Sequence, residues 1–410
     1  MKISQPKFIL WGTFLSVILG LLSGGFFIEA SLNIQWVGQL FLNALKMTII
    51  PLIFSAVVSG ICNLNKNSNF GRTGLITVTY YTITTSVAVL IGLLSVNLLE
   101  PGKGLKLNIN ESNQYAGSDE AISFSDIPLS MVTDNLFKSA TNGELLPIII
   151  FAVLFAVALL KVDSKGERLI VFFGDINTIM MQIVSWIMML TPIGVFALVS
   201  SRVAEAGGLE GFSDEIKAVG KYVVCVIFGL AVHFFFLFLV LKKITSHGFL
   251  YIKFLLRALI TAFGTASSSA TLPTSLACTN EAGVNPSTSK FVLPLGATVN
   301  MDGTALYEAV AVMFIAQVYG IDLGVGQQLI VFITATLAAI GAAGIPQAGL
   351  VTMVLVLTAV NLPLEGVGLL LAVDWFLDRF RTTINVWGDS VGAAVVEQMT
   401  NQQGKVRGSN

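Results

Sequence analysis

The amino-acid sequence predicts a polytopic membrane protein built from α-helices. Hydrophobic residues make up 54% of the 410 residues, whereas charged residues make up only 11%. The mean hydropathy of +0.81 is far above the range of soluble proteins. Apolar runs long enough to cross about 30 Å of hydrocarbon recur along the chain.

The N-terminal part is expected to form six hydrophobic helices. The apolar runs that predict them are residues 8–28, 37–61, 74–99, 145–160, 169–200 and 222–241. The first run is longer than the apolar core of a usual signal peptide, and no clear small-residue cleavage motif closes it, so we expect an uncleaved helix. Lys46 and Pro51 interrupt the second run, which predicts a kink or a buried polar spot there.

The basic residues predict the orientation in the membrane. With the N-terminus inside, thirteen Lys and Arg residues fall in inside segments and six in outside segments. Cytoplasmic segments carry the excess of Lys and Arg, so we expect cytoplasmic termini and an even number of full crossings. The long polar segment, residues 101–143, is then extracellular.

Several function classes lack support. Cys62, Cys225 and Cys278 are isolated and indicate neither a disulfide framework nor a metal centre. The histidines, His233 and His247, are likewise isolated. No basic patch with interleaved aromatic residues indicates nucleic-acid binding.

The pattern of the chain changes after residue 246. Segments 260–277 and 337–357 are apolar tracts interrupted by small residues and a proline, and acid-bearing segments follow each of them. Interrupted segments at matching places in two halves are typical of a transporter binding site. The alternative is two ordinary helices that pack through small residues.

The segment 373–389, VDWFLDRFRTTINVWGD, predicts a helix with one polar face. At 100° per residue, its polar side chains fall within one stripe about 100° wide. These side chains are Asp374, Asp378, Arg381, Thr382, Asn385 and Asp389. Intramembrane charges of this kind face a bundle interior or a water-filled cavity and are functional by default. The alternative is an internal ion-pair ladder between Arg381 and the acids, which only holds the helix in place.

Charge counting predicts what this face binds. Three carboxylates and one guanidinium lie on the stripe, and Asp302 in the NMDGT segment adds another acid. The planar fork of Arg381 matches a carboxylate, and Asp378 can pair with the ammonium of a free amino acid. Asp302 and Asp389 then need cations, and oxygen ligands suit alkali or alkaline-earth ions, of which Na⁺ is expected in a transporter.

Glu308 lies six residues after Asp302 in an apolar helix. Burial favours its neutral form, and a carboxyl that gains and loses a proton during transport is a candidate proton carrier. The alternative is a permanently protonated, hydrogen-bonded acid.

Five segments together resemble the dicarboxylate/amino acid:cation symporter family, which has the glutamate transporter fold. They are YYTITTS (80–86), TASSSATLP (265–273), GATVNMDGTALYEAV (296–310), GAAGIPQAGL (341–350) and DWFLDRFRTTINVWGDS (374–390). The resemblance implies an all-α homotrimer in which each chain has eight transmembrane helices plus two re-entrant helical hairpins, arranged as inverted repeats. It also implies that a transport domain moves across the bilayer in an elevator-like motion.

The resemblance implies a division of the chain into parts. Residues 1–73 and 129–245 would be largely scaffold and trimerisation helices, 74–100 the third helix of the transport domain, and 101–143 the extracellular loop. Residues 246–402 would be the transport core, followed by a tail at 403–410. Within the core lie hairpin 1 (about 250–288), helix 7 (about 289–317), hairpin 2 (about 324–360) and helix 8 (about 361–402), by the same resemblance.

Site residues follow from the same resemblance. Arg381 would bind the side-chain carboxylate of the substrate and Asp378 its ammonium. The rest of the substrate site would be Thr304, Thr382 and Asn385, with Ser267 and Ser268 at the first hairpin tip and Gly344 and Ile345 at the second. One sodium site would use Gly296, Asn300, Asn385 and Asp389. A second would use Thr298 with Ala339, Ile340 and Gly341, and a third Tyr81, Thr84, Thr85, Asn300 and Asp302.

Two departures within the family affect the expected coupling. Archaeal members carry an arginine at the first hairpin tip, where this chain has Ala266, and Arg379 supplies a neighbouring guanidinium as in animal members. Glu308 also follows the animal pattern, where the equivalent acid is tied to proton and potassium coupling. We therefore expect protons to be coupled as well as sodium, and a return of potassium is compatible with this pattern.

The expected function is import of L-glutamate or L-aspartate with Na⁺ and H⁺, without an organic cofactor, in the inner or plasma membrane. Alternatives within transport are coupling to protons only, or a neutral amino acid or C4-dicarboxylate substrate. The chain is not expected to be an enzyme, because the serine triplet at 267–269 has no histidine base in a matching motif. A pure anion channel would have no use for a full set of cation ligands.

Overall fold

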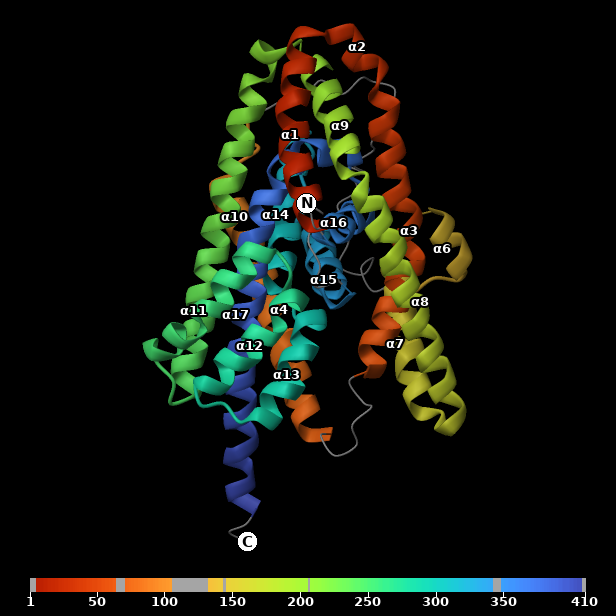
Figure 1. Ribbon diagram of the computed structural model, residues 1–410. Coiled ribbons are helices and arrows are strands. Elements are labelled where there is room, and N and C mark those ends of the chain that lie inside the picture. Colours follow the sequence, from red (N-terminus) through yellow and green to blue (C-terminus); the bar gives the residue numbers. More distant parts are fainter. Residues whose placement is uncertain are drawn as a thin grey trace.

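The described part of the chain is helical throughout. The computed structural model describes residues 5–63, 71–104, 132–142, 145–205, 207–341 and 348–407, and these residues contain no strand (Figure 1). Helices satisfy every backbone hydrogen bond within one segment, which lipid requires of a spanning element. This confirms the prediction of an all-α protein.

Three of the first four helices follow predicted apolar runs, and the short second helix was not predicted. The four helices are α1 (Gln5–Phe26), α2 (Ile28–Asn33), α3 (Gln35–Asn63) and α4 (Gly71–Leu99). Pro51 lies inside α3 without ending it, and the Ser55 hydroxyl donates to the Pro51 carbonyl at 2.7 Å. The polar interruption therefore belongs to a continuous helix.

The next group corrects one expected span. It comprises α6 (Leu136–Asn142), α7 (Leu145–Lys161), α8 (Asp163–Met189), α9 (Thr191–Glu205) and α10 (Leu209–Ile244). The run 169–200 was expected to be one helix, but the chain breaks between α8 and α9 at Leu190. Pro192 explains the break, because proline lacks an N–H and fits the first turn of a new helix.

The C-terminal part consists of short helices and one long helix. The short ones are α11 (Phe249–Thr265), α12 (Ser268–Glu281), α13 (Pro286–Val299), α14 (Asp302–Val318), α15 (Val325–Gly341) and α16 (Ala348–Ala359). A 3₁₀ turn at Leu364–Gly366 then leads into α17 (Val367–Arg407). Helix α11 packs on α12, and α15 packs on α16, so each interrupted segment forms a pair of neighbouring helices.

Two breaks in this part have local causes. Between α11 and α12, Ala266 takes a left-handed conformation with φ of 49°, and the Ser267 side chain caps α12 by accepting from the Ala270 N–H at 3.2 Å. The segment 289–317 was expected to be one helix, but it divides at Asn300 and Met301 into α13 and α14. The second break sets two polar side chains, Asn300 and Asp302, at the ends of two helices.

Helix α14 lies at the centre of the molecule, and all but one of its residues are buried. It packs against α4, α10, α15, α16 and α17. On the other side of the molecule in Figure 1, α3 packs against α7, α8 and α9, and α1 packs along α9. Side chains such as Trp11, Trp36 and Leu98 are exposed on outer helices, which suits a lipid-facing surface.

Five helical segments of the described chain are long and apolar enough to cross a membrane, by length and composition. They are Ile28–Ser59, Thr73–Leu99, Gly166–Ile187, Lys217–Ile244 and Pro286–Val318. Shorter apolar helices are Trp11–Phe26, Pro147–Lys161, Val325–Ile340 and Gly349–Ala359. The fold is therefore that of a multi-pass membrane protein with a central, buried broken helix.

Candidate functional site

The polar stripe of α17 lies in the interior. Asp374, Asp378, Arg381, Thr382, Asn385 and Asp389 are all buried. Helix α17 packs against α10, α13 and α14, which places this face against the break between α13 and α14. Desolvated charges must be paired or must bind ions, so the partners of each group decide what the site can do.

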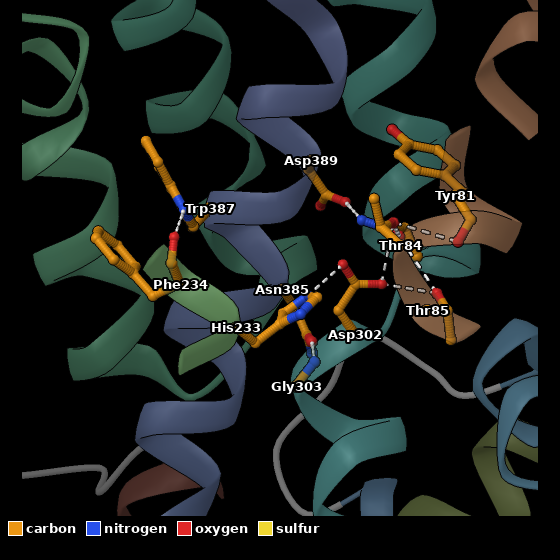
Figure 2. A network of polar contacts seen from close by, with 11 residues as sticks. Tyr81, Thr84, Thr85, His233, Phe234, Asp302, Gly303, Asn385, Trp387 and Asp389 are labelled. Carbon is orange, nitrogen blue, oxygen red and sulfur yellow. Dashed lines mark hydrogen bonds and ion pairs between the residues drawn. The ribbon is translucent and has the colours of Figure 1, made fainter. Parts of the chain in front are cut away.

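Four oxygen atoms converge beside this break. The Thr85 hydroxyl donates to Asp302 Oδ1 at 2.7 Å, and it lies 3.5 Å from Asn300 Oδ1. The Thr84 hydroxyl lies 3.4 Å from the same two acceptors. All four side chains are buried, and they come from α4 and from the two sides of the break. Figure 2 shows Thr84 and Thr85 facing Asp302. We call Thr84, Thr85, Asn300 and Asp302 the oxygen cluster.

The oxygen cluster has the chemistry of a hard-cation site. Hydroxyl, amide and carboxylate oxygens suit Na⁺, Mg²⁺ or Ca²⁺ rather than transition metals. In the described ranges no group of three or more His, Cys, Asp and Glu side chains could hold a metal ion, so the single acid among neutral oxygens distinguishes this cluster from a transition-metal centre. The residues present therefore fit a small monovalent cation.

Tyr81 lies next to the cluster but uses its hydroxyl elsewhere. Its hydroxyl donates to the Val292 carbonyl at 2.9 Å, and its own carbonyl lies 3.3 Å from the Thr84 hydroxyl. In this arrangement the Tyr81 side chain fixes α4 against α13. A role of Tyr81 in holding a cation would fall to its backbone oxygen.

Asn300 and Asn385 connect the cluster to α17. Asn300 Nδ2 donates to Asp389 Oδ1 at 3.0 Å. Asn385 accepts from the Gly303 N–H at 2.8 Å, and its Nδ2 lies 3.2 Å from the Thr304 hydroxyl. The first turn of α14 is therefore held directly by α17, and Asp389 keeps one carboxylate oxygen without a protein donor in the described hydrogen bonds.

Glycine allows the helices to approach this closely. A Cβ built on Gly303 would lie 2.5 Å from the Arg381 carbonyl oxygen and 3.0 Å from its Cα, both of which are backbone atoms. A Cβ on Gly296 would overlap the Asp389 carboxylate and the Tyr81 hydroxyl. At both positions the absent side chain makes room for the site.

Arg381 is fully buried and paired with two acids. Nη2 donates to Asp378 Oδ1 at 2.7 Å, and Nη1 lies 3.2 Å from Asp374 Oδ1. Its guanidinium also lies 4.1 Å from the centre of the Tyr307 ring, a cation–π contact. The ion-pair ladder that the sequence left open as an alternative is thus present in this structure.

The ladder is incomplete as a set of hydrogen bonds. Arg381 Nε and Nη1, and both oxygens of Asp374, are buried without a hydrogen-bond partner among the described residues. The start of α16 lies close by, since a Cβ on Gly349 would be 2.5 Å from Arg381 Nη1. Buried donors without acceptors are costly, so the guanidinium can still take an anionic ligand.

Glu308 is buried one turn beyond Thr304 on α14. Neither of its carboxyl oxygens has a hydrogen-bond partner in the described part of the chain. Its polar neighbours are the Thr352 hydroxyl on α16 and the Arg381 guanidinium. The carboxyl therefore lies between α16 and the charged stripe.

The remaining predicted residues fall into three groups. Ser267 and Ser268 are buried at the start of α12, and Thr304 lies on α14 beside Asn385. Thr298 is exposed, and its hydroxyl donates to the Leu295 carbonyl at 3.0 Å, so it does not join the oxygen cluster. Ala339, Ile340 and Gly341 end α15, which packs against α13, whereas Gly344 and Ile345 lie outside the described residues.

Two contacts were not predicted from the sequence. His233 on α10 lies with Nε2 3.0 Å from Asp302 Oδ2, and both side chains are buried (Figure 2). The interpretation of this histidine as isolated was therefore wrong, and its place in the middle of an apolar run was the available signal. Arg379 Nη1 donates to the Phe263 carbonyl at 2.9 Å, which fastens α17 to the last turn of α11.

Comparisons with known proteins agree with the resemblance seen in the sequence. Residues 9–399 match the sequence profile of the sodium:dicarboxylate symporter family. Excitatory amino acid transporter 1 of Ambystoma tigrinum is 38% identical over 89% of this chain and 77% of its own length. An excitatory amino acid transporter of Caenorhabditis elegans is 37% identical over 93% of this chain and 85% of its own. Excitatory amino acid transporter 3 of Mus musculus is 37% identical over 89% of this chain and 79% of its own length.

Proposed function

Because the chain belongs to the sodium:dicarboxylate symporter family, whose members are transporters and not enzymes, we propose that it imports L-glutamate or L-aspartate together with Na⁺. The observation that carries this proposal is the buried guanidinium of Arg381, whose Nε has no hydrogen-bond partner among the described residues, beside a buried cluster of oxygens that suit a hard cation. The names of the relatives, which are excitatory amino acid transporters, support an acidic amino acid as substrate.

Substrate binding would exchange one ion pair for two. The side-chain carboxylate of the substrate would take the fork of Arg381, and its ammonium would take Asp378, which Arg381 holds at 2.7 Å in the present arrangement. Thr304, Thr382 and Asn385 would complete the site from α14 and α17. The hairpin residues Ser267, Ser268, Gly344 and Ile345 would contribute through their backbone.

Cation binding would offset the excess of negative charge. The two acids Asp374 and Asp378 face a single cationic side chain, Arg381. Asp302 and Asp389 are two further buried acids, and a bound glutamate would add one more negative charge. One Na⁺ would bind the oxygen cluster with the Tyr81 carbonyl. A second would bind Asp389 with carbonyl oxygens of Gly296, Asn300 and Asn385, and a third the region of Thr298 and residues Ala339, Ile340 and Gly341. A buried carboxylate is costly without a cation, so cation and substrate are expected to bind with positive cooperativity.

Glu308 would carry the proton. Its buried carboxyl lies near the Thr352 hydroxyl of α16 and the Arg381 guanidinium, so its protonation state would change when these two groups move away from it. Coupling to protons without Na⁺ remains the alternative within the same family.

We further propose the architecture that the resemblance implies. It has eight transmembrane helices and two re-entrant hairpins with inverted repeats, in a homotrimer of the inner or plasma membrane with cytoplasmic termini. Residues 1–73 and 129–245 would form most of the scaffold, and 74–100 with 246–402 the transport domain that moves as an elevator. The pairing of α11 with α12 and of α15 with α16 supports the two hairpins.

The test is uptake of labelled glutamate and aspartate into proteoliposomes, with Na⁺, H⁺ and K⁺ gradients imposed one at a time. The proposal expects uptake to need an inward Na⁺ gradient and to rise with an inward H⁺ gradient. Uptake driven by H⁺ alone would favour the proton-only alternative, and labelled succinate or serine tests the C4-dicarboxylate and neutral substrates.

The variant Arg381→Cys tests the substrate class. We expect it to abolish uptake of glutamate while leaving uptake of a neutral amino acid possible, because the fork that holds the second carboxylate is gone. If glutamate uptake persisted unchanged, the assignment of Arg381 to the substrate's second carboxylate would be wrong.

A further inference from the structure

Between Lys221 and Lys242 the apolar helix α10 contains no Asp, Glu, Lys or Arg, and His233 is its single histidine there. Its side chain is fully buried and lies at the edge of the oxygen cluster, although the proposed transport cycle gives it no task. Ionisable groups at such depth are rare and functional by default, so this histidine needs its own account.

The contact divides the two oxygens of Asp302 between two partners. His233 Nε2 lies 3.0 Å from Oδ2, and the Thr85 hydroxyl donates to Oδ1 at 2.7 Å. A carboxylate only accepts, so the Nε2 nitrogen carries the hydrogen of this bond. The bond fixes the rotation of the carboxylate, and Oδ1 is thereby kept toward Thr84 and Thr85 (Figure 2).

The histidine ring is itself held in place. It lies against the Phe236 ring with 5.8 Å between ring centres. Next to it, Trp387 Nε1 of α17 donates to the Phe234 carbonyl at 3.2 Å, and the Phe234 and Trp387 rings stack at 4.8 Å. Helix α10 is thus fastened to α17 beside His233, and the donor is presented to Asp302 from a fixed direction.

The other ring nitrogen separates two interpretations of this contact. Nδ1 is buried and has no hydrogen-bond partner within the described residues, so the ring makes a single polar contact, to Asp302. If His233 only joined α10 to α14, an apolar side chain could do so equally well by packing. A hydrogen-bond donor behind a carboxylate that binds a cation instead orients the oxygen that contacts the cation.

We propose that His233 is a positioning residue for a cation bound at the oxygen cluster, acting by holding Asp302 with Oδ1 directed toward the hydroxyls of Thr84 and Thr85. The proposal rests on the proposed Na⁺ coupling and assigns one of its determinants to α10. Outer partners of ligand side chains typically change metal affinity about 10- to 100-fold when they are removed.

The experiment compares two variants of the purified full-length protein. His233→Phe keeps a ring but removes the donor, whereas His233→Gln places an amide nitrogen near the position of Nε2. Sodium chloride is titrated against choline chloride at constant ionic strength, and the thermal unfolding midpoint and the binding of labelled glutamate are followed. We expect H233F to raise the half-saturating Na⁺ concentration about 10-fold or more, and H233Q to stay within about threefold of the wild type.

Further readouts separate positioning from a structural role. At saturating Na⁺ the glutamate affinity of both variants should equal that of the wild type. Trp387→Phe is the matched control, because it removes the neighbouring bond to the Phe234 carbonyl without touching Asp302. It should lower the unfolding midpoint without changing the Na⁺ dependence. If H233F does not fold, His233→Asn replaces it, since the shorter amide does not reach Asp302 and should give the same weakening.

The possible outcomes are distinct. An unchanged half-saturating Na⁺ concentration in H233F or H233N, with or without a lower unfolding midpoint, overturns the positioning role. The positioning role is also overturned if H233Q is weakened as strongly as H233F. A wild-type protein whose unfolding midpoint and glutamate binding ignore Na⁺ would instead reject the proposed Na⁺ coupling and, with it, this inference.

Discussion

Replacing Arg381 by lysine keeps the charge of the stripe and removes the fork. In the present arrangement Nη2 binds Asp378 at 2.7 Å, while Nε and Nη1 have no hydrogen-bond partner among the described residues. A substrate carboxylate would take a pair of parallel N–H donors that includes Nη2, which becomes free when the substrate ammonium takes Asp378. A lysine ammonium can neutralise Asp374 and Asp378, but it cannot offer two parallel N–H donors to a carboxylate.

The expected loss follows from one charged hydrogen bond. A hydrogen bond to a charged group contributes about 1.5–3 kcal/mol, and each 1.4 kcal/mol changes an equilibrium constant about tenfold. Arg381→Lys should therefore raise the dissociation constant of glutamate about 10- to 150-fold. The protein should still fold, because the buried acids keep a cationic partner.

The assay is equilibrium binding of labelled glutamate to the purified protein at saturating Na⁺. Arg257→Lys is the control, because Arg257 of α11 forms an exposed ion pair with Glu281 of α12 at 2.9 Å, and such pairs contribute little. A dissociation constant for R381K within about threefold of the wild type would refute the reasoning that the fork of Arg381 holds the substrate.

Two further predictions concern α14. Gly303→Ala should destabilise the protein by about 1–3 kcal/mol, because its Cβ would meet the backbone of Arg381 and push α14 from α17. Gly220→Ala, whose Cβ meets nothing within 4 Å, is the control, and equal unfolding midpoints for the two variants would contradict the close approach. Glu308→Gln should flatten the pH dependence of uptake, because an amide cannot exchange the proton; an unaltered pH profile would remove the carrier role.

The sequence predicted those features that repeat along one element. The spacing of polar residues from Asp374 to Asp389 predicted one buried face of α17, because a single helical period determines it. The small residues near 266–269 and 341–349 predicted interrupted segments, and a pair of packed helices forms at each, α11 with α12 and α15 with α16. Pro273, by contrast, lies inside α12 without ending it.

Two features that depend on contacts between distant elements were not predicted. His233 and Asp302 lie 69 residues apart, and only the packing of α10 on α14 brings them together. The break at Asn300 and Met301 contains neither glycine nor proline, and its stability comes from bonds to α4 and α17. For the break at Leu190, by contrast, the sequence holds a signal, Pro192. It was missed because the apolar run 169–200 continues on both sides of this proline.

Asn300 has a consequence for how the two proposed cation sites communicate. Its amide is a two-ended connector, with the nitrogen toward Asp389 and the oxygen toward Thr84 and Thr85. Turning this amide over would set oxygen against carboxylate at one end and nitrogen against the cation position at the other. Both proposed sites therefore require the same orientation of the Asn300 amide. A cation that stabilises this orientation at one site would raise the affinity of the other site for its own cation.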